Sequence, residues 1–378
     1  MLIASEDRQQ SLDDLEIRIY ATADGYTAEI RAPDGSAASC EMPPFPFESR
    51  DLSSLAPRSY GIELFRWLFQ KDVLDLFRRS RWGAESYSRS AGPVGGLRLR
   101  LWLDREAGPV HGLRWEALYD PERDAPLAAE TAFSRFVRSP APYGWPVRER
   151  PLRVLLAAAD PEGLAELEVR GIGSILDRLA GTGTVQQVRP VLEVDRLFDD
   201  PSLQDLQERL RRRYHILHLW ARTTADGSLV IRSGGLPQQI PFRDVAKALL
   251  SPDAAPHLVF LVPGGLVEPT AEEKLADLAT ALLDAGAQAV VVLQGTIDEK
   301  ELLIFTERFY DVLLRSGTID VAVTEARTKL YNIDPESWGW TAPALHVRVA
   351  EGLLFQPLPE MVQSLVQSPV FQSFKENL

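Results

Sequence analysis

The second half of the sequence is built from short, almost unbroken apolar runs that alternate with helical patterns. The clearest apolar runs are RVLLAAAD at 153–160, YHILHLWAR at 214–222, APHLVFLVPGG at 255–265 and AQAVVVLQG at 287–295. Strands that are buried on both faces have this composition, whereas a strand with one wet face alternates apolar and polar residues. VQQVRPVL at 185–192 and the closing ALHVRVAEG at 344–352 are expected to be further strands. Helical patterns lie between the runs, at 164–180, 203–213, 242–250, 272–286, 300–317 and 319–331. The alternation predicts an α/β fold, a mostly parallel sheet with helices on both faces.

A different pattern occupies the first 92 residues. Three segments alternate in strand fashion, with Asp24-Gly25 and Asp34-Gly35 between them, as in a β meander. From Ser59 a helical apolar face runs to Phe77, and the basic RRSRW at 78–82 is expected to end that helix, because cations favour a helix C-terminus. We therefore expect a smaller β-rich N-terminal region at 1–92. An α/β domain at 97–356, opening with the strand LRLRLWLD, and an amphipathic tail at 357–378 would follow it.

Charge and cysteine content exclude several classes of function. The formal net charge of −13 argues against binding nucleic acid or an anionic membrane, which basic surfaces normally recognise. No apolar run reaches the roughly 20 residues of a membrane span, and the first residues do not resemble a signal peptide, so a cytoplasmic protein is expected. The single cysteine, Cys40, permits neither a disulfide nor a cysteine zinc cluster. It is expected to be a small, half-buried residue on a hairpin strand.

Several motif-like stretches fail as sites. GIGSILD at 171–177 lacks the third glycine of a dinucleotide loop and lies within a helical pattern. His215 and His218 stand three apart on a strand, so they point to opposite faces and cannot share a metal. The arginines at 209 and 211–213 are expected to be a solvated helix end. We expect no metal and no cofactor.

An ordered set of segments resembles the CHAT domains, a family of caspase-like peptidases. GLRWEALYDPE at 112–122 is similar to the Pro-Trp-Glu-Leu-Leu-Tyr-Asp signature that opens these domains. YHILHLWAR resembles the family strand that reads roughly Asp-Val-Leu-His-Phe-Ala-Gly-His-Gly, and APHLVFLVPGG resembles the strand that ends in Leu-Asn-Ala-Cys. The resemblance runs from Leu97 to Phe355 in order, and it includes a strand and loop at 153–163, a strand and the following helix at 284–310, and the closing strand at 341–349. It implies a caspase-like fold.

The resemblance breaks at the two residues that carry the family's chemistry. The first histidine of the family pattern is retained as His218, but Arg222 stands at the position of the second, the general base. Gly264 stands at the position of the cysteine nucleophile, and Gly265 follows it. A cysteine peptidase needs a thiolate and a nearby imidazole. Glycine offers no attacking atom, and a guanidinium stays protonated near neutral pH, so it cannot act as a base.

The favoured hypothesis is a catalytically dead CHAT-like pseudoprotease that works through protein contacts. Its expected partner is an active protease, another component of a bacterial signalling or defence system, or a second copy of itself. His218, Arg222, Gly264 and Gly265 would border a vestigial peptide pocket, where an extended peptide could add as a strand and Arg222 could pair with a carboxylate. The alternative is an enzyme. Its site would be completed by a partner chain, or its nucleophile would be another hydroxyl, for which the candidates are Thr223, Thr224, Ser233 and Thr270. A small-molecule sensor that uses the empty pocket is the third hypothesis.

Overall fold

The structure is a computed structural model. It describes residues 12–43, 55–88, 96–140, 143–159, 166–181, 191–198, 201–224, 226–233, 236–250, 254–264, 269–295, 297–349 and 351–357. The strands are β1 (Asp13–Thr22), β2 (Gly25–Arg31), β3 (Ala37–Met42), β4 (Leu97–Leu103), β5 (Tyr119–Asp120), β6 (Ala125–Pro126), β7 (Ala132–Phe136), β8 (Leu152–Ala159), β9 (Leu192–Leu197), β10 (Ile216–Thr224), β11 (Ser228–Ser233), β12 (Leu236–Pro241), β13 (Leu258–Gly264), β14 (Ala289–Leu293) and β15 (Pro343–Val347). The helices are α2 (Pro57–Leu68), α3 (Lys71–Ser88), α4 (Gly108–His111), α5 (Leu127–Glu130), α6 (Glu166–Leu179), α7 (Leu203–Leu210), α8 (Phe242–Leu249), α9 (Pro269–Asp284), α10 (Glu299–Ser316) and α11 (Ile319–Ile333), with 3-10 turns η1 (Trp115–Ala117) and η3 (Gly339–Thr341).

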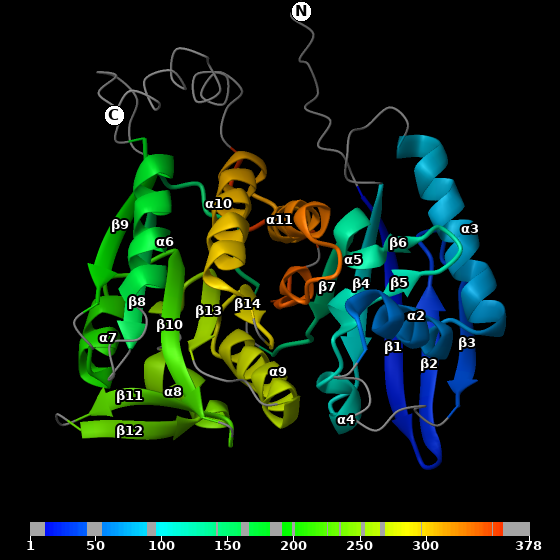
Figure 1. The fold of residues 1–378 in the computed structure, drawn as a ribbon, viewed down its shortest axis with the longest axis horizontal. Coiled ribbons are helices and arrows are strands. Elements are labelled where there is room, and N and C mark those ends of the chain that lie inside the picture. The colour runs from blue at the N-terminus through cyan, green and yellow to red at the C-terminus, as the bar shows by residue number, and fades with distance from the viewer. Residues whose placement is uncertain are drawn as a thin grey trace, which may run out of the picture.

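One large sheet runs through the molecule (Figure 1). Its order is β9-β8-β10-β13-β14-β15-β7-β4-β1-β2-β3, and the hairpin β11-β12 pairs with the last residues of β10. β9, β8, β10, β13 and β14 are parallel, and β15 turns antiparallel to β14. β15, β7, β4 and β1 are again parallel to one another. The predicted α/β fold with a mostly parallel sheet is confirmed.

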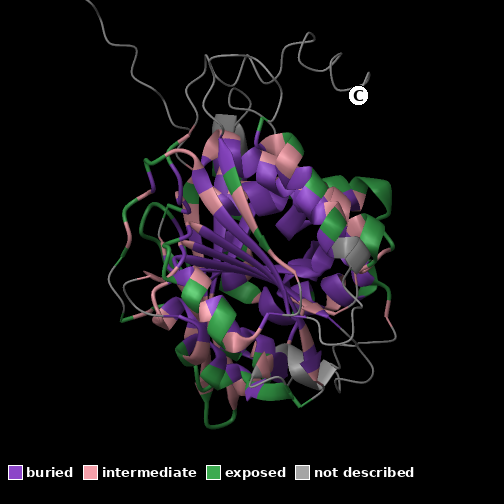
Figure 2. Ribbon diagram, turned by 90° about the vertical axis from the view of Figure 1, so that its left-hand side faces the viewer, coloured by how far each residue is buried: buried purple, intermediate pink, exposed green. Residues whose placement is uncertain are grey.

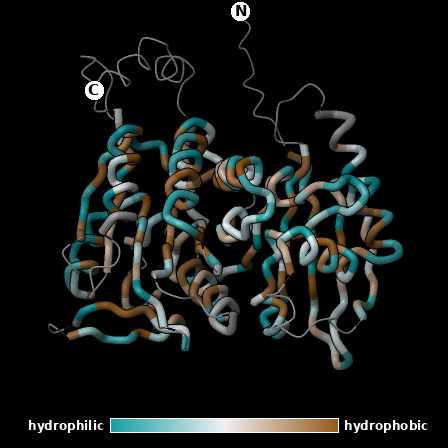
Figure 3. The backbone as a smooth tube through the Cα atoms, in the orientation of Figure 1, coloured by the Kyte–Doolittle hydropathy of each residue, from teal (hydrophilic) through white to brown (hydrophobic). Residues whose placement is uncertain are grey.

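Alternate residues of the buried strands pack into two separate hydrophobic cores, one on each face of the sheet. In β8, Val154, Leu156 and Ala158 pack beneath α6, α10 and α11, whereas Leu155 and Ala157 face α7, α8 and α9 on the other side. This follows from the two-residue period of a strand, because both faces of the central strands are covered. The buried strands lie inside the molecule and the exposed positions lie on the outer helices and loops (Figure 2). Hydrophobic residues, brown in Figure 3, recur along these strands, and the helices alternate hydrophobic with hydrophilic positions.

The N-terminal segment shares the sheet. Its predicted meander forms β1, β2 and β3, and β1 pairs in parallel with β4, the strand expected to open the α/β domain. A third core, drawn from residues between Leu15 and Phe133, joins β1–β4 to α2 and α3. The third core ends at Phe133, and the first residue of the core beneath α6, α10 and α11 is Val147. The predicted domain boundary, at residues 92–97, lies earlier in the chain than this change of core.

The helix predicted from residue 59 to 82 differs from the structure in two ways. It is broken after Leu68, where Lys71 takes a left-handed backbone (φ 48°), and its second part continues to Ser88. The predicted C-terminal cations are therefore within α3. Arg81 is 5% exposed and its guanidinium lies 3.1 Å from Asp120 and 2.5 Å from Glu130, an arrangement set by partners distant in the sequence.

Two strand predictions were also incomplete. The strand expected at 185–192 lies mostly outside the described residues, and the strand found there is β9, which begins at Leu192. The hairpin β11-β12 was not predicted, although Asp226-Gly227 and Gly234-Gly235 are turn signals on either side of β11. Pro237 and Pro241 within β12 weaken its strand pattern, because proline is confined to edge strands, and β12 is an edge.

Candidate functional site

The two substituted positions lie side by side at the carboxyl ends of adjacent parallel strands. The register of β10 against β13 pairs Arg222 with Gly264, and four residues earlier it pairs His218 with Phe260. Carboxyl ends of parallel strands are where ligands and chemistry collect in α/β sheets. The structure thus brings together Arg222 and Gly264, as the resemblance implied. Gly265 lies outside the described residues.

His218 is a core residue. Its side chain is completely buried, its ring stacks on Phe260 at 4.3 Å, and its Nδ1 lies 3.0 Å from the Tyr310 hydroxyl. Burial lowers the pKa of His218 to about 3, so the imidazole is neutral at any physiological pH. The expectation that His218 borders a peptide pocket is not met, because no ligand at the strand ends can reach it.

Trp220 occupies the space that a nucleophile side chain would need. A Cβ atom built on Gly264 would lie 2.1 Å from Cζ2 and 2.2 Å from Cη2 of the Trp220 indole. Trp220 is 4% exposed and belongs to the core beneath α6 and α10, so the ring is held in place. In the family pattern the position of Trp220 is an alanine. The Trp220 indole therefore fills the space that a side chain at position 264 would enter.

The threonine hydroxyls at the end of β10 are engaged in structural hydrogen bonds. Thr223 is 8% exposed and its Oγ1 donates to the carbonyl oxygen of Gly264 at 3.2 Å. The Thr224 hydroxyl bonds the carboxylate of Asp226. None of the five histidines of the sequence is hydrogen-bonded to either hydroxyl among the described contacts. The side chains of Ser233 and Thr270 lie outside what the structure describes.

Arg222 is half-buried between two strands. It pairs with Val230 of β11 on one side and with Gly264 of β13 on the other. It lies at the carboxyl end of β10, and its correspondence to the family's general base stays a prediction.

The two neighbouring histidines 215 and 218 do not meet. The Nδ1 of His215 accepts a hydrogen bond from the backbone N–H of Arg153, and its ring lies 6.5 Å from that of His257, at the amino-terminal ends of β10 and β13. Across the described residues, no three His, Cys, Asp or Glu side chains are placed to hold a metal ion.

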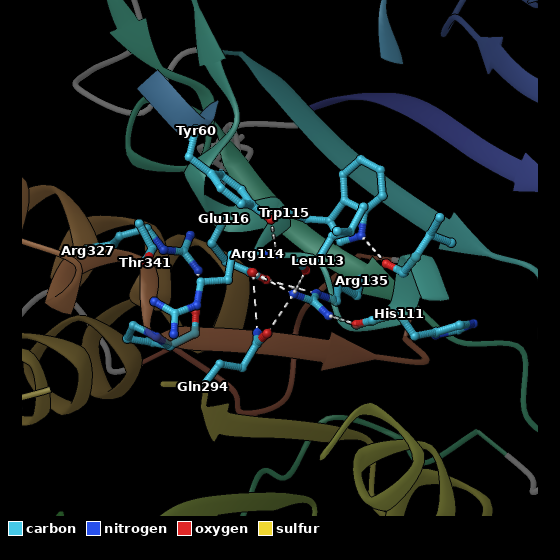
Figure 4. Close-up of polar contacts among 12 residues, drawn as sticks. Tyr60, His111, Leu113, Arg114, Trp115, Glu116, Arg135, Gln294, Arg327 and Thr341 are labelled. Atoms are coloured by element: carbon cyan, nitrogen blue, oxygen red, sulfur yellow. Dashed lines mark hydrogen bonds and ion pairs between the residues drawn. The ribbon is translucent and has the colours of Figure 1, made fainter. Parts of the chain in front are cut away.

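A buried ion-pair network that the sequence did not reveal joins the GLRWEALYDPE segment to the sheet (Figure 4). Glu116 is wholly buried, and its two carboxylate oxygens accept from Arg135 Nε at 3.0 Å and Nη2 at 2.6 Å. Arg135 also donates to the Gln294 side chain at 3.1 Å and to the carbonyls of His111 and Leu113. Glu116, Arg135 and Gln294 are each 3% exposed or less, so the network lies in the interior and joins this segment to the sheet.

The one sequence feature that indicates this ion-pair network is Arg135, an arginine inside an apolar strand. Arg135 interrupts TAFSRFV, and a charged side chain is almost never fully buried without a partner. Arg327 lies nearby in Figure 4 and donates to the carbonyls of Ala128 and Pro343, and burial lowers its pKa to about 10. The sequence does not say that Glu116 is the partner of Arg135, because nineteen residues separate them.

The only cysteine offers no substitute nucleophile. Cys40 lies on β3 opposite Ala28 and is 9% exposed, and burial raises the pKa of its thiol. Cys40 lies on a hairpin strand as predicted, and it is buried where a half-buried residue was expected. We expect a colorimetric disulfide reagent to label the native protein at least about tenfold more slowly than the unfolded chain, because the thiolate is the reactive form. Equal labelling rates in the two states would contradict this.

The mostly parallel sheet with helices on both faces defines an α/β protein. The chain matches the CHAT domain family over residues 58–348, and it belongs to that family. A search of curated protein sequences found no match. The described helices include none that is both long and apolar enough to cross a membrane.

Solved structures that match this chain include an Arg-specific cysteine proteinase and a separase–securin complex. The chain is 9% identical to gingipain R, described as an Arg-specific cysteine proteinase, covering 72% of this chain and 59% of that chain with a TM-score of 0.38. It is 10% identical to Porphyromonas gingivalis RgpB in the complex of its pro- and mature domains, covering 72% of this chain and 60% of that chain with a TM-score of 0.39. It is 10% identical to Saccharomyces cerevisiae separase in the securin complex, covering 89% of this chain and 30% of that chain with a TM-score of 0.49. The chain spans less than two thirds of each of these proteins, and the likeness concerns the fold alone.

Proposed function

We propose that this chain is a catalytically inactive CHAT domain, a pseudoprotease that acts as a protein-interaction or regulatory subunit. The observation that carries the proposal is the Trp220 indole, which lies 2.1 Å from the Cβ that a residue at Gly264 would need. Arg222 beside it has no basic nitrogen to take up a proton near neutral pH. Both halves of a thiol–imidazole pair are thus missing, and the space for one of them is filled.

The alternative, a hydrolase with a hydroxyl nucleophile, has less support. An activated Ser or Thr needs an adjacent base, and the hydroxyls of Thr223 and Thr224 instead bond a backbone carbonyl and a carboxylate. A site completed by a partner chain would cleave peptide only when that partner is present.

Exposed aromatic side chains favour action through protein contacts. Tyr143 is 64% exposed and Trp145 is 89% exposed, both on the connection from β7 to β8. Large aromatic residues are enriched at protein interfaces, where they contribute much of the binding energy. The proposed partner is an active protease, another component of a cytoplasmic bacterial signalling or defence system, or a second copy of the chain.

Strand addition to β12 is not the favoured mode of contact. β12 is an edge strand whose Pro237 and Pro241 have no N–H to donate to an incoming strand. A partner is therefore expected to use side-chain contacts around Trp145 more than the β12 edge.

A peptidase assay with a matched variant tests the proposal. The purified protein, alone and with the products of the neighbouring genes, is incubated with a peptide library and with a thiol-directed peptidase probe, beside an active CHAT peptidase. We expect no cleavage above buffer and no labelling by this chain, and no change in Thr223→Ala. Cleavage that disappears in Thr223→Ala or Ser233→Ala would establish the hydrolase instead.

Co-purification with those gene products tests the interaction half of the proposal. We expect one product to be retained by the wild type and to be retained at least about tenfold less by Trp145→Ser, since an exposed aromatic anchor contributes on the order of 2 kcal/mol. Trp82→Ser, at another exposed tryptophan (74%), is the matched control and should bind normally. A monomer that retains none of the products would argue strongly against a regulatory subunit.

A further inference from the structure

The sheet ends at β3, beyond β1 and β2 (Figure 1). β3 pairs only with β2 among the described strands, so its other side is an edge that none of them covers. Proteins commonly protect such edges with prolines or charged side chains. β12 has two prolines and β9 has three charged residues, whereas β3, AASCEM, has no proline and one charge. β3 is therefore the described edge that is most open to a further strand.

Three residues of β3 direct their backbone polar groups away from β2. The N–H of Ala32 donates to the carbonyl oxygen of Ser36 at 2.8 Å, so these two residues form a hydrogen-bonded pair. Such pairs alternate along an antiparallel ladder, and the register places the next two at Ala38 and Cys40. The residues whose N–H and C=O groups point outward are therefore Ala37, Ser39 and Glu41. All three are exposed, so an incoming strand could reach them.

A groove lies between this edge and α3. Its volume is about 850 Å³, within the range of ligand pockets. The lining residues are Ala37, Ala38 and Ser39 of β3 with Asp72, Asp75, Arg78 and Arg79 of α3. Alternate side chains of an added strand would point into this groove, because successive residues of a strand face opposite sides. Main-chain hydrogen bonds to an edge give strand addition its affinity, and pockets for alternate side chains give it specificity.

The charges of α3 are ordered along the groove. The pKa of the Cys40 thiol is raised by burial and by the charge of Asp72, so Asp72 lies near Cys40. Lys71 acts in the opposite direction on that pKa, but it does not line the groove. The pKa of Asp34 is lowered by hydrogen bonds within its turn and by the charge of Arg79, so Arg79 lies near the start of β3. α3 therefore runs antiparallel to β3.

Two of the four charges in the groove are open to a ligand. Arg78 pairs with Glu122 and lies 3.6 Å from Asp75. Asp72 and Arg79 form no ion pair of this kind among the described residues. The groove thus has a negative charge beside the end of β3 and a positive charge beside its start.

We propose that an extended segment of a protein partner adds to β3 as an antiparallel strand, with a basic side chain beside Asp72 and an acidic one beside Arg79. Antiparallel pairing is favoured because its hydrogen bonds are slightly stronger, so the basic residue comes first in the segment. The two α3 charges lie beside Cys40 and beside the turn before Ala37, so the matching residues should be about four apart on one face of the strand. This surface is separate from Trp145 and uses no residue near Gly264. The proposal therefore stands or falls independently of the pseudoprotease proposal.

Binding of a designed peptide to the full chain tests the proposal. The probe is the capped peptide Ac-Thr-Lys-Val-Thr-Val-Glu-Thr-amide, in which the basic residue comes first. The comparison probe, Ac-Thr-Glu-Val-Thr-Val-Lys-Thr-amide, has the same composition in the reverse order. We expect the first probe to bind with a dissociation constant below about 1 mM. The second should bind at least about threefold more weakly, because it can match both charges only as a parallel strand.

Amide hydrogen exchange identifies the mode of binding. The outward amides of β3 should exchange rapidly in the free protein and slow down when the first probe is bound, because each then donates to the peptide. The amides of Ala38 and Cys40, which already face β2, should not change. Slow exchange of the outward amides in the free protein would overturn the proposal, because the edge would already be paired. Binding without the alternating pattern would also overturn it.

Three variants locate the binding. Ser39→Pro removes one outward N–H and leaves the bonds to β2 intact, so binding should fall at least about tenfold. Asp72→Lys combined with Arg79→Glu exchanges the charges on the surface of α3, and should make the second probe the tighter of the two. Trp145→Ser is the control and should bind the first probe normally.

The outcomes that contradict strand addition at β3 are distinct. The proposal is overturned if neither probe binds at about 10 mM, or if Ser39→Pro binds as the wild type does. It is also overturned if the charge exchange leaves the preference between the probes unchanged, which can be measured even if Ser39→Pro fails to fold. Loss of binding in Trp145→Ser would place the peptide at the other surface.

Discussion

Gly264→Ala is expected to lower the free energy of unfolding by about 2–3 kcal/mol, the cost of forcing an extra methyl group into a packed core. The new Cβ would lie 2.1 Å and 2.2 Å from two carbons of the Trp220 indole. Such contacts are far inside van der Waals distance, so the ring or the strand must move. Trp220 is 4% exposed within the core, and it has no free space to move into without disturbing its neighbours. Guanidinium chloride denaturation measures the change.

Gly83→Ala is the matched control. Gly83 is exposed inside α3 and a Cβ there meets nothing within 4 Å. This change should stabilise the protein by about 0.5–1 kcal/mol, because glycine weakens a helix interior. A Gly264→Ala variant as stable as the wild type would mean that the indole does not occupy the nucleophile's space.

A double-mutant cycle then isolates the contact between the two residues. Trp220→Ala alone should cost about 3–5 kcal/mol, since it leaves a cavity in the core. With the indole removed, Gly264→Ala is expected to cost almost nothing, which gives a coupling of about 2 kcal/mol. Additive effects would show that the cost of the alanine comes from the backbone and not from Trp220.

That contact could not be predicted from the sequence. Arg222 and Gly264 can be compared with the family from the sequence alone, because each stands at a fixed position of the family pattern. The role of Trp220 depends on the register of two parallel strands whose residues are forty positions apart, and registers of parallel strands have no local signal. Apolar periodicity shows that Trp220 is buried and does not show which backbone atom it covers.

The predictable part of the fold has a common cause. Unbroken runs such as LVFLV in β13 and AVVVL in β14 need only local composition to be identified, and the hairpin turns at Asp24-Gly25 and Asp34 are local too. The break between α2 and α3 and the buried environment of Arg81 depend on tertiary partners. The prediction that residues 78–82 form a basic helix end was wrong for that reason. Asp120 and Glu130 pair with Arg81, which is buried.

Glu116→Gln is expected to lower the free energy of unfolding by about 3–5 kcal/mol. Removing one partner of a buried ion pair leaves the other charge uncompensated in a medium that solvates it poorly. Glu116 is wholly buried and Arg135 is 3% exposed, and glutamine keeps the shape while it removes the charge. The matched control is Glu307→Gln, whose pair with Arg178 is about half exposed and should contribute less than about 1 kcal/mol. Equal losses in the two variants would contradict the importance of burial.

The double variant Glu116→Leu with Arg135→Met separates the ion pair from the shape it fills. Apolar replacement of both partners of a buried pair is often neutral or stabilising, so we expect the double variant to recover most of the stability lost by Glu116→Gln. Gln294 would then lose its contacts with both charged groups. Because Gln294 directly follows β14, the end of that strand should become less protected from amide hydrogen exchange even as global stability returns. Recovered stability with unchanged exchange at residues 291–293 would mean that the pair supports the core without positioning the strand end.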